Sequence, residues 1–208
     1  MSARPRVVRD DAAGIAAAVE VLRAGGVVAL PTDTVYGIAV SLDTPGGIER
    51  LFAIKERPLE KGIALLLAGR LQAWHVGVPT LEARRLAAAC WPGPLTLVLE
   101  RAPGIELPDV LTGGTATIGV RVPDHATPRA LAEAVGPLPT TSANLSGSPD
   151  AFDAAEVMAQ IGDRIDLVLD GGRSGGVAAS TVVDCTRDPV AILRQGVLGE
   201  PRIREILA

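Results

Sequence analysis

The stretch VVALPTDTVYGIAV at residues 27–40 decides the fold class. Its apolar residues 27–30 predict a buried strand, and residues 35–40 predict a second strand after a short polar loop. No helix separates these two strands, and none separates the strands predicted at 180–185 and 190–194, which together indicate a hairpin. Consecutive strands without a helix between them predict a mixed α/β sheet instead of a regular doubly wound one.

The rest of the chain alternates, imperfectly, between helical and strand-like patterns. Apolar residues at helical spacing predict helices, and short apolar runs bounded by turn residues predict buried strands. The predicted helices are 11–24, 46–54, 69–75, 80–90, 127–135, 153–161 and 201–207. The other predicted strands are 63–67, 95–99, 117–122, 138–141 and 165–169.

The chain shows no sign of a division into several domains. Residues 102–116 are rich in proline and glycine and are expected to form a long loop. No internal repeat, low-complexity tail or interdomain linker is present in the sequence. Residues 1–208 are therefore expected to form a single domain, with its core at about 10–198.

The composition favours a globular domain and disfavours two common ways of binding nucleic acid. Of 208 residues, 48% are hydrophobic and 21% are charged, which is typical of a domain with a substantial core. Only two Trp, one Tyr and two Phe are present, so base stacking on an aromatic surface is disfavoured. The net charge is −4, whereas proteins that neutralise phosphates along a polynucleotide are usually basic.

The sequence also argues against secretion, membrane insertion and a resident metal. Residues 1–11 lack the apolar core of a signal peptide, and no run of about 18 apolar residues could span a membrane, so a cytoplasmic protein is expected. Cys90 and Cys185 lack CxxC spacing, and with only two histidines they form no convincing metal cluster. Two buried thiols are expected, with a disulfide between them as the alternative.

The two lysines differ from the other basic residues in their placement. Of 20 basic side chains only two are lysine, and these, Lys55 and Lys61, lie within one seven-residue stretch. Because a compact ammonium can do what a planar guanidinium cannot, this placement indicates a functional site, with chance clustering as the alternative. As a surface lysine at a helix end, Lys55 is expected to contribute little to folding stability.

Four polar clusters lie at the ends of predicted elements, where α/β proteins tend to place ligand sites. Positive charges suit a polyphosphate or a carboxylate, and Asn and Ser donors with free backbone N–H groups suit either anion. Each cluster also has a structural interpretation, as a β-turn, a solvated helix end or a capping turn. The clusters are PTDTVYG at 31–37, KERP at 55–58 with Lys61 beyond it, TTSANLSG at 140–147, and GGRSGG at 171–176, which leads to STVVD at 180–184.

Motifs for covalent catalysis and for the common nucleotide-binding loops are absent from the sequence. It contains no GxxxxGK[ST], no GxGxxG that opens a helix, and no GxSxG followed by Asp and His. His75 and His125 are expected to have structural roles. Charge stabilisation and the positioning of ligands remain as the available chemistry.

Seven segments, in this order, resemble the YrdC-like family of L-threonylcarbamoyladenylate synthases. Any one segment would be a weak match, whereas seven in family order over about residues 14–196 are specific. The family's KxR and SxN pair is present as Lys55 with Arg57 and Ser142 with Asn144. The segments are PTDTVYGIA at 31–39, KERPLEKG at 55–62, WPGPLTLVL at 91–99, TIGVRVPDH at 117–125, TTSANLSG at 140–147, STVVDCT at 180–186 and ILRQG at 192–196.

The resemblance implies a fold, a reaction and a set of site residues. The family fold is a twisted mixed sheet flanked by helices, with a concave basic ligand cleft. The family reaction joins L-threonine, bicarbonate and ATP, with Mg²⁺, into threonylcarbamoyl-AMP and pyrophosphate, for N6-threonylcarbamoyladenosine modification of tRNA. The expected threonine-site residues are Thr34, Arg121, Ser142 and Ser180. The expected ATP-site residues are Arg57, Lys61, Thr117, Asn144 and Arg194. Lys55 and Arg57 are the expected catalytic pair, and no metal ligand is expected from the protein.

Two positions depart from the longer members of the family, which often carry Asn where Lys61 stands and His where Leu66 stands. Leu66 leaves the threonine site one polar contact short. The longer members also carry a second C-terminal domain, so a stand-alone catalytic domain is expected here.

The resemblance also implies partners, and it leaves two other functions open. The product would pass to the transferase complex that modifies tRNA, and any binding of tRNA itself is expected to be weak. The alternatives are a non-enzymatic RNA-binding paralogue of the same fold and a carbamoyl-adenylate-forming domain of a larger protein.

Overall fold

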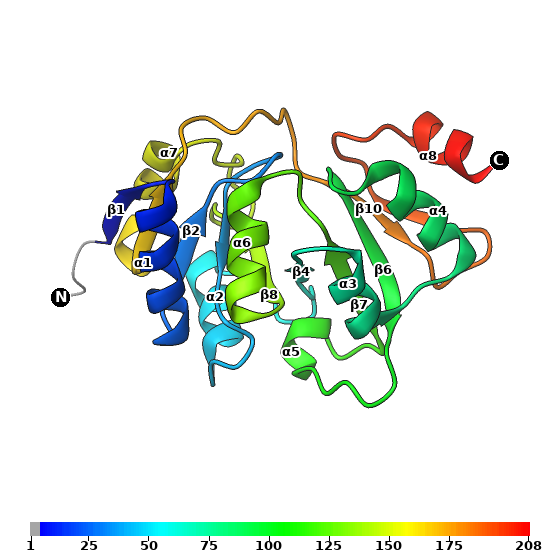
Figure 1. Ribbon diagram of the computed structural model, residues 1–208, viewed down its shortest axis with the longest axis horizontal. Coiled ribbons are helices and arrows are strands. Elements are labelled where there is room, and N and C mark those ends of the chain that lie inside the picture. The colour runs from blue at the N-terminus through cyan, green and yellow to red at the C-terminus, as the bar shows by residue number, and fades with distance from the viewer. Residues whose placement is uncertain (1–4) are drawn as a thin grey trace.

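The computed structural model describes residues 5–208 and arranges their strands in one mixed sheet (Figure 1). The order across the sheet is β1-β9-β2-β3-β8-β4-β7-β6-β10-β11, and the short β5 pairs with β6. The strands are β1 (Arg6–Arg9), β2 (Val28–Leu30), β3 (Gly37–Ala39), β4 (Ala64–Leu66), β5 (Gly77–Val78), β6 (Leu95–Arg101), β7 (Thr117–Arg121), β8 (Leu138–Ser142), β9 (Leu167–Asp170), β10 (Thr181–Asp184) and β11 (Ala191–Arg194).

The strand directions confirm the mixed sheet that residues 27–40 predict. Strands β2 and β3 pair antiparallel across the polar loop, and β10 and β11 form the predicted hairpin. Four other neighbours are parallel: β1 with β9, β2 with β9, β4 with β7, and β6 with β10. A short connection permits only the antiparallel arrangement, and so the loop length decides this part of the topology.

Helices cover both faces of the sheet. Helices α1 and α6 pack against each other and against one face, over β2, β9, β4 and β8. The opposite face packs into the larger core cluster, to which α2 and α7 contribute (Figure 1). The helices are α1 (Ala12–Arg23), α2 (Gly47–Lys55), α3 (Arg70–Val76), α4 (Leu81–Cys90), α5 (Asp109–Thr112), α6 (Ala126–Val135), α7 (Ala154–Ile161) and α8 (Glu200–Leu207), and a 3₁₀ turn, η1, spans Gly162–Arg164.

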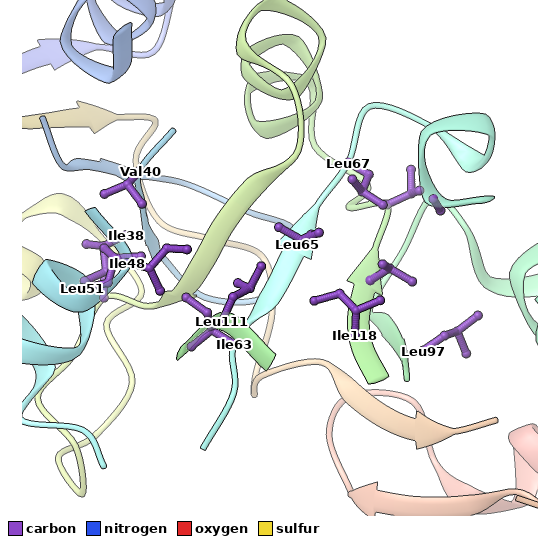
Figure 2. Packing of buried hydrophobic residues seen from close by; sticks show 14 of the residues in the cluster. Ile38, Val40, Ile48, Leu51, Ile63, Leu65, Leu67, Leu97, Leu111 and Ile118 are labelled. Carbon is purple, nitrogen blue, oxygen red and sulfur yellow. The ribbon is translucent and has the colours of Figure 1, made fainter. Parts of the chain in front are cut away.

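The two faces of the sheet differ in how far their cover extends. Alternate residues of each strand point to opposite faces, and one set, which includes Leu65, Leu97 and Ile118, packs into the larger core cluster (Figure 2). The smaller cluster contains buried residues of α1 and α6 and, from the sheet, buried residues of β2, β3, β4, β8 and β9. Within the described residues it takes none from β6, β7 or β10. This face of those three strands is therefore left open beside α6.

Three features of the described residues differ from the sequence-based expectation. Strand β1 was not predicted, because an exposed edge strand with arginine at both ends carries no apolar run. The expected loop at 102–116 contains the single-turn helix α5, which buries Leu111. The short strand β5 also escaped prediction, because two residues are too few for a pattern. Within the described part of the chain, no helix has both the length and the apolar character needed to cross a bilayer.

Candidate functional site

A cleft of about 410 Å³ lies on the open face of the sheet. Strand register places Gly119 of β7 beside Ala64 of β4 on one side and Val98 of β6 on the other, so the floor is continuous across strands. The floor consists of alternate residues that share this face: Ala64 and Leu66 on β4, Thr96 and Val98 on β6, Thr117, Gly119 and Arg121 on β7, and Thr140 and Ser142 on β8. Side walls come from residues that include Thr34, Arg57, Ser180 and Arg194.

Arg121 is held at the floor of the cleft by three groups. Its Nε donates to the Gly93 carbonyl at 3.1 Å, its Nη1 donates to the Thr34 hydroxyl at 2.9 Å, and its Nη2 pairs with the Asp33 carboxylate. These bonds use three of the five N–H groups of a guanidinium and leave donors for a ligand. Burial lowers the pKa of Arg121, and the charge of Asp33 opposes that effect. Arg121 is therefore a fixed, charged fork beside the cleft.

The polar loop between β2 and β3 supplies two of the three partners of Arg121, namely Asp33 and Thr34. The Thr32 hydroxyl accepts from the Thr34 backbone N–H at 3.0 Å and donates to the Val35 carbonyl at 2.7 Å, which folds the loop on itself. Behind the loop, a Cβ added at Gly176 would lie 2.3 Å from the Thr34 carbonyl oxygen. The glycine-rich segment thus supports Thr34 by close backbone packing. The structural interpretation of the 31–37 cluster as a turn is confirmed, and its functional interpretation stays a prediction.

A second group of hydrogen bonds surrounds Ser180 at the opposite wall. The Ser180 hydroxyl lies 2.8 Å from the Thr96 hydroxyl and accepts from Arg194 Nη2 at 3.1 Å. Arg194 also donates to the Ser180 carbonyl through Nε at 3.0 Å and Nη2 at 2.9 Å. A residue expected at the threonine site and a residue expected at the ATP site are therefore in direct contact.

Lys55 is a buried residue, so the expectation of a surface lysine was wrong, and the small effect on stability that was inferred from it loses its basis. Its side chain is 2% exposed, although it ends helix α2. The ammonium donates to the Ser142 carbonyl at 2.7 Å, to the Ser142 hydroxyl at 3.3 Å, to the Asn144 carbonyl and to Asn144 Oδ1 at 3.0 Å. The Ser142 hydroxyl in turn donates to Asn144 Oδ1 at 2.6 Å. Lys55 thus holds the loop after β8 in shape, because it occupies several acceptors of that loop at once.

The ionisation of Lys55 predicts a specific pH dependence of stability. Burial, followed by repulsion from Arg57, lowers the pKa of Lys55 from 10.5 to about 8. Between these two values the unfolded chain binds the proton that the folded chain has lost, so the contribution of Lys55 to the free energy of unfolding rises with pH. We expect the difference in free energy of unfolding between wild type and Lys55→Met to shift by about 2 kcal/mol in favour of wild type from about pH 7.5 to about pH 9.5. Urea unfolding of both proteins at both pH values measures this, and a constant difference would contradict it.

Arg57 brings a further positive charge to the cleft. Its Nε donates to the Lys61 carbonyl at 3.0 Å and its Nη2 donates to the Gly62 carbonyl at 3.1 Å, which anchors the side chain to the turn after α2. Partial burial and then the charge of Arg194 lower the pKa of Arg57. The lining therefore combines Arg57, Arg121 and Arg194, and no aspartate or glutamate is among the described residues that line it.

The structure brings together nine of the ten expected site residues, in two layers. Lys55 and Asn144 lie behind Ser142 and contact the cleft through it. Lys61 is exposed on the turn after α2 and does not line the cleft. The residues that line it directly are Thr34, Arg57, Thr117, Arg121, Ser142, Ser180 and Arg194. The binding role of each of these ten residues stays a prediction.

Three residues belong to this arrangement although sequence analysis assigned them no role. Asp33 pairs with Arg121, and its Oδ2 is buried without a hydrogen-bond partner in the described residues. Thr96 interrupts the apolar run of its strand with a hydroxyl that reaches Ser180, a signal that could have been noticed. Gly119 interrupts another strand at the centre of the floor. Asp33 and Gly119 act through contacts between distant strands, which no local pattern reveals.

Comparison with known proteins shows the family and the fold of the chain. The Sua5/YciO/YrdC family model, which is described as telomere recombination, matches residues 20–196. A threonylcarbamoyl-AMP synthase of Vibrio cholerae is 41% identical over 183 residues, which is 86% of this chain and 95% of that protein.

Solved structures extend the match to the whole sheet. The structure of P. abyssi Sua5 complexed with L-threonine matches with a TM-score of 0.90 and 33% identity, over 99% of this chain and 60% of that one. The structure of E. coli YciO matches with a TM-score of 0.84 and 30% identity, over 98% of this chain and all of that one. On the family model, the sequence identity and the fold together, the chain belongs to the Sua5/YciO/YrdC family.

Proposed function

We propose that this chain is an L-threonylcarbamoyl-AMP synthase that condenses L-threonine, bicarbonate and ATP. The observation that supports this most is the cleft itself, in which three arginines converge on a floor of small and hydroxylated residues. Such a lining suits two anionic substrates, a carboxylate and a triphosphate, held side by side. The Vibrio cholerae relative is named threonylcarbamoyl-AMP synthase, and P. abyssi Sua5 was solved with L-threonine.

The threonine side of the cleft is proposed to lie at Arg121, Thr34, Ser142 and Ser180. The free donors of Arg121 would bind the threonine carboxylate as a fork, because its three fixed contacts hold it in one orientation. The hydroxyl groups of the wall would then bind the amino and hydroxyl groups of the substrate. Leu66 lines the same floor and would pack against the substrate methyl group.

The ATP side is proposed to lie at Arg57, Thr117, Asn144 and Arg194, and Lys61, which is exposed on the turn after α2, is proposed to contact the nucleotide from outside the lining. The amine of threonine joins bicarbonate to form a carbamate and water, and a carbamate oxygen then attacks the α-phosphorus. The bond from that phosphorus to the bridging oxygen breaks, and pyrophosphate leaves. Negative charge grows on the phosphate oxygens during the attack, and Arg57 and Arg194 would offset it. Lys55 would act by holding Ser142 and Asn144 in place.

The remaining participants belong to the same proposal. Mg²⁺ would enter with ATP and neutralise phosphate charge. No group of three or more His, Cys, Asp or Glu able to hold a metal ion occurs within residues 5–208. A separate enzyme complex would transfer the threonylcarbamoyl group of the product to tRNA, and AMP would leave.

Pyrophosphate release tests the proposed function directly. We expect release from ATP, Mg²⁺ and bicarbonate to require L-threonine, and to be slower with serine, which lacks the methyl group that Leu66 would contact. A coupled phosphate assay measures the release, and chromatography of the adenylate identifies the product. Release that ignores threonine but responds to carbamoyl phosphate would favour carbamoyl-adenylate chemistry, and no release in any mixture would favour the RNA-binding paralogue.

A further inference from the structure

Gly119 occupies the centre of the cleft floor. It is the middle residue of β7, with Thr117 two residues before it and Arg121 two residues after it on the same face. Ala64 flanks it on β4, and Val98 flanks it on β6. At Gly119 no side chain covers the backbone of β7, and a ligand there would contact the backbone of the sheet directly.

Neither the backbone nor the packing of the protein requires glycine at this position. The backbone of Gly119 lies outside the left-handed region, and a Cβ built on it would lie 3.5 Å from the Ala64 Cβ and 3.6 Å from the Thr96 methyl carbon, which are ordinary contacts. The other two glycines of the lining differ. A Cβ on Gly37 would lie 2.9 Å from the Thr140 methyl carbon, and a Cβ on Gly62 would lie 2.9 Å from the Leu111 carbonyl oxygen.

A glycine that neither the backbone conformation nor the packing requires indicates that a ligand comes close to the backbone at that position. Glycine within a strand weakens the strand and often marks a place where a ligand comes close to the backbone. The nearest atoms to a Cβ at Gly119, the Ala64 Cβ and Cα and the Thr96 methyl carbon, all lie at 3.5 Å or more, and Gly119 lines the cleft. The absence of a side chain at position 119 therefore leaves room for a ligand in the cleft.

The position of Gly119 relates that space to the reaction. Arg121, on the threonine side, and Thr117, on the ATP side, each lie about 7 Å along the strand from Gly119. The two sides also touch elsewhere, since Ser142 contacts Lys55 and Asn144, and Ser180 contacts Arg194. The middle of the floor is thus where groups bound at the two sides would meet.

We propose that Gly119 is the floor residue at the junction of the two substrates, and that its bare backbone lets the carbamate oxygen approach the α-phosphorus. This rests on the proposed function. Any side chain at position 119 would leave each substrate its own subsite and keep the two reacting atoms apart.

The test compares separate and joint binding in wild type and Gly119→Ala. Calorimetry measures the threonine Kd alone and with saturating α,β-methylene-ATP, a non-reactive analogue, and the pyrophosphate assay measures kcat. For Gly119→Ala we expect each ligand alone to bind within about twofold of wild type, joint binding of threonine to weaken at least about tenfold, and kcat to fall roughly 10- to 100-fold. Gly119→Val should abolish joint binding.

Two controls keep this test decisive. The melting temperature of Gly119→Ala should equal or exceed that of wild type, because alanine is favoured over glycine in a strand. Gly69→Ala is the matched control: a Cβ at position 69 meets nothing within 4 Å, and the residue does not line the cleft. That variant should match wild type in binding and in kcat.

Several outcomes would overturn the proposal. A folded Gly119→Ala with wild-type joint binding and kcat would show that the space is not used. Loss confined to one ligand measured alone would place Gly119 within a single subsite. A wild-type protein that binds both ligands but releases no pyrophosphate would instead overturn the synthase activity, and the binding comparison would still decide on Gly119.

Discussion

Replacement of Lys55 by methionine is expected to abolish adenylate formation and to destabilise the protein by about 2–4 kcal/mol. Methionine keeps much of the volume of the side chain, so the change isolates the ammonium. Its loss leaves the carbonyls of Ser142 and Asn144 without their buried donor, and each such group costs about 1–3 kcal/mol. The end of β8 and the loop after it, which carry Ser142 and Asn144, would then relax, and the ligands proposed to bind there would lose their contacts. Urea unfolding and pyrophosphate release measure the two effects.

The other lysine of the chain provides the control for stability. Lys61 is exposed, and Lys61→Met is expected to change the free energy of unfolding by no more than about 0.5 kcal/mol. If Lys55→Met were as stable as Lys61→Met, the ammonium would not organise the loop after β8. If Lys55→Met were destabilised but retained wild-type kcat, the role of Lys55 would be structural alone.

Replacement of Arg121 by methionine is expected to cost about 3–5 kcal/mol and to remove threonine-dependent activity. The side chains of Arg121 and Asp33 are 7% and 12% exposed, so the variant leaves a nearly buried carboxylate without its partner. The added change Asp33→Asn removes that charge. We expect the double variant to regain at least about 2 kcal/mol and to remain inactive, because the fork for the threonine carboxylate is still missing. Urea unfolding and threonine titration calorimetry measure both parts.

An arginine on the surface provides the matched control for that pair. Arg204 is 74% exposed and pairs with Glu200 on α8, so Arg204→Met is expected to cost no more than about 1 kcal/mol. A double variant that regained threonine-dependent activity together with stability would show that Arg121 serves the fold and not the substrate.

The predictions from sequence succeeded where the deciding information was local. The apolar run at 27–30 and the short loop after it are enough to require antiparallel neighbours, and the structure confirms that pair. Helix α1 begins where Asp11 caps the Gly14 N–H, a pattern visible in the sequence. Strand β1 and helix α5 escaped prediction, because the first depends on its pairing with β9 and the second on the burial of Leu111.

Lys55 shows where the sequence-based reasoning about the site failed. Its position at the end of a helix indicated an exposed ammonium, since most lysines are exposed. Its burial depends on the loop after β8, about 90 residues further along the chain, which supplies acceptors for every N–H. The spacing of residues near Lys55 contains no information about that loop.

The sequence by itself determined the class of the fold, the order of most elements and the residue types of the site, because these depend on periodicity, turn length and clusters of polar residues. Only the tertiary structure decided which face of the sheet is open. It also decided that three arginines line the cleft and that Lys55 lies behind it. Strand register set these features: it places Gly119 between Ala64 and Val98, and it brings residues far apart in the chain within hydrogen-bonding distance. Register follows from the packing of the whole core, and so no single segment contains it.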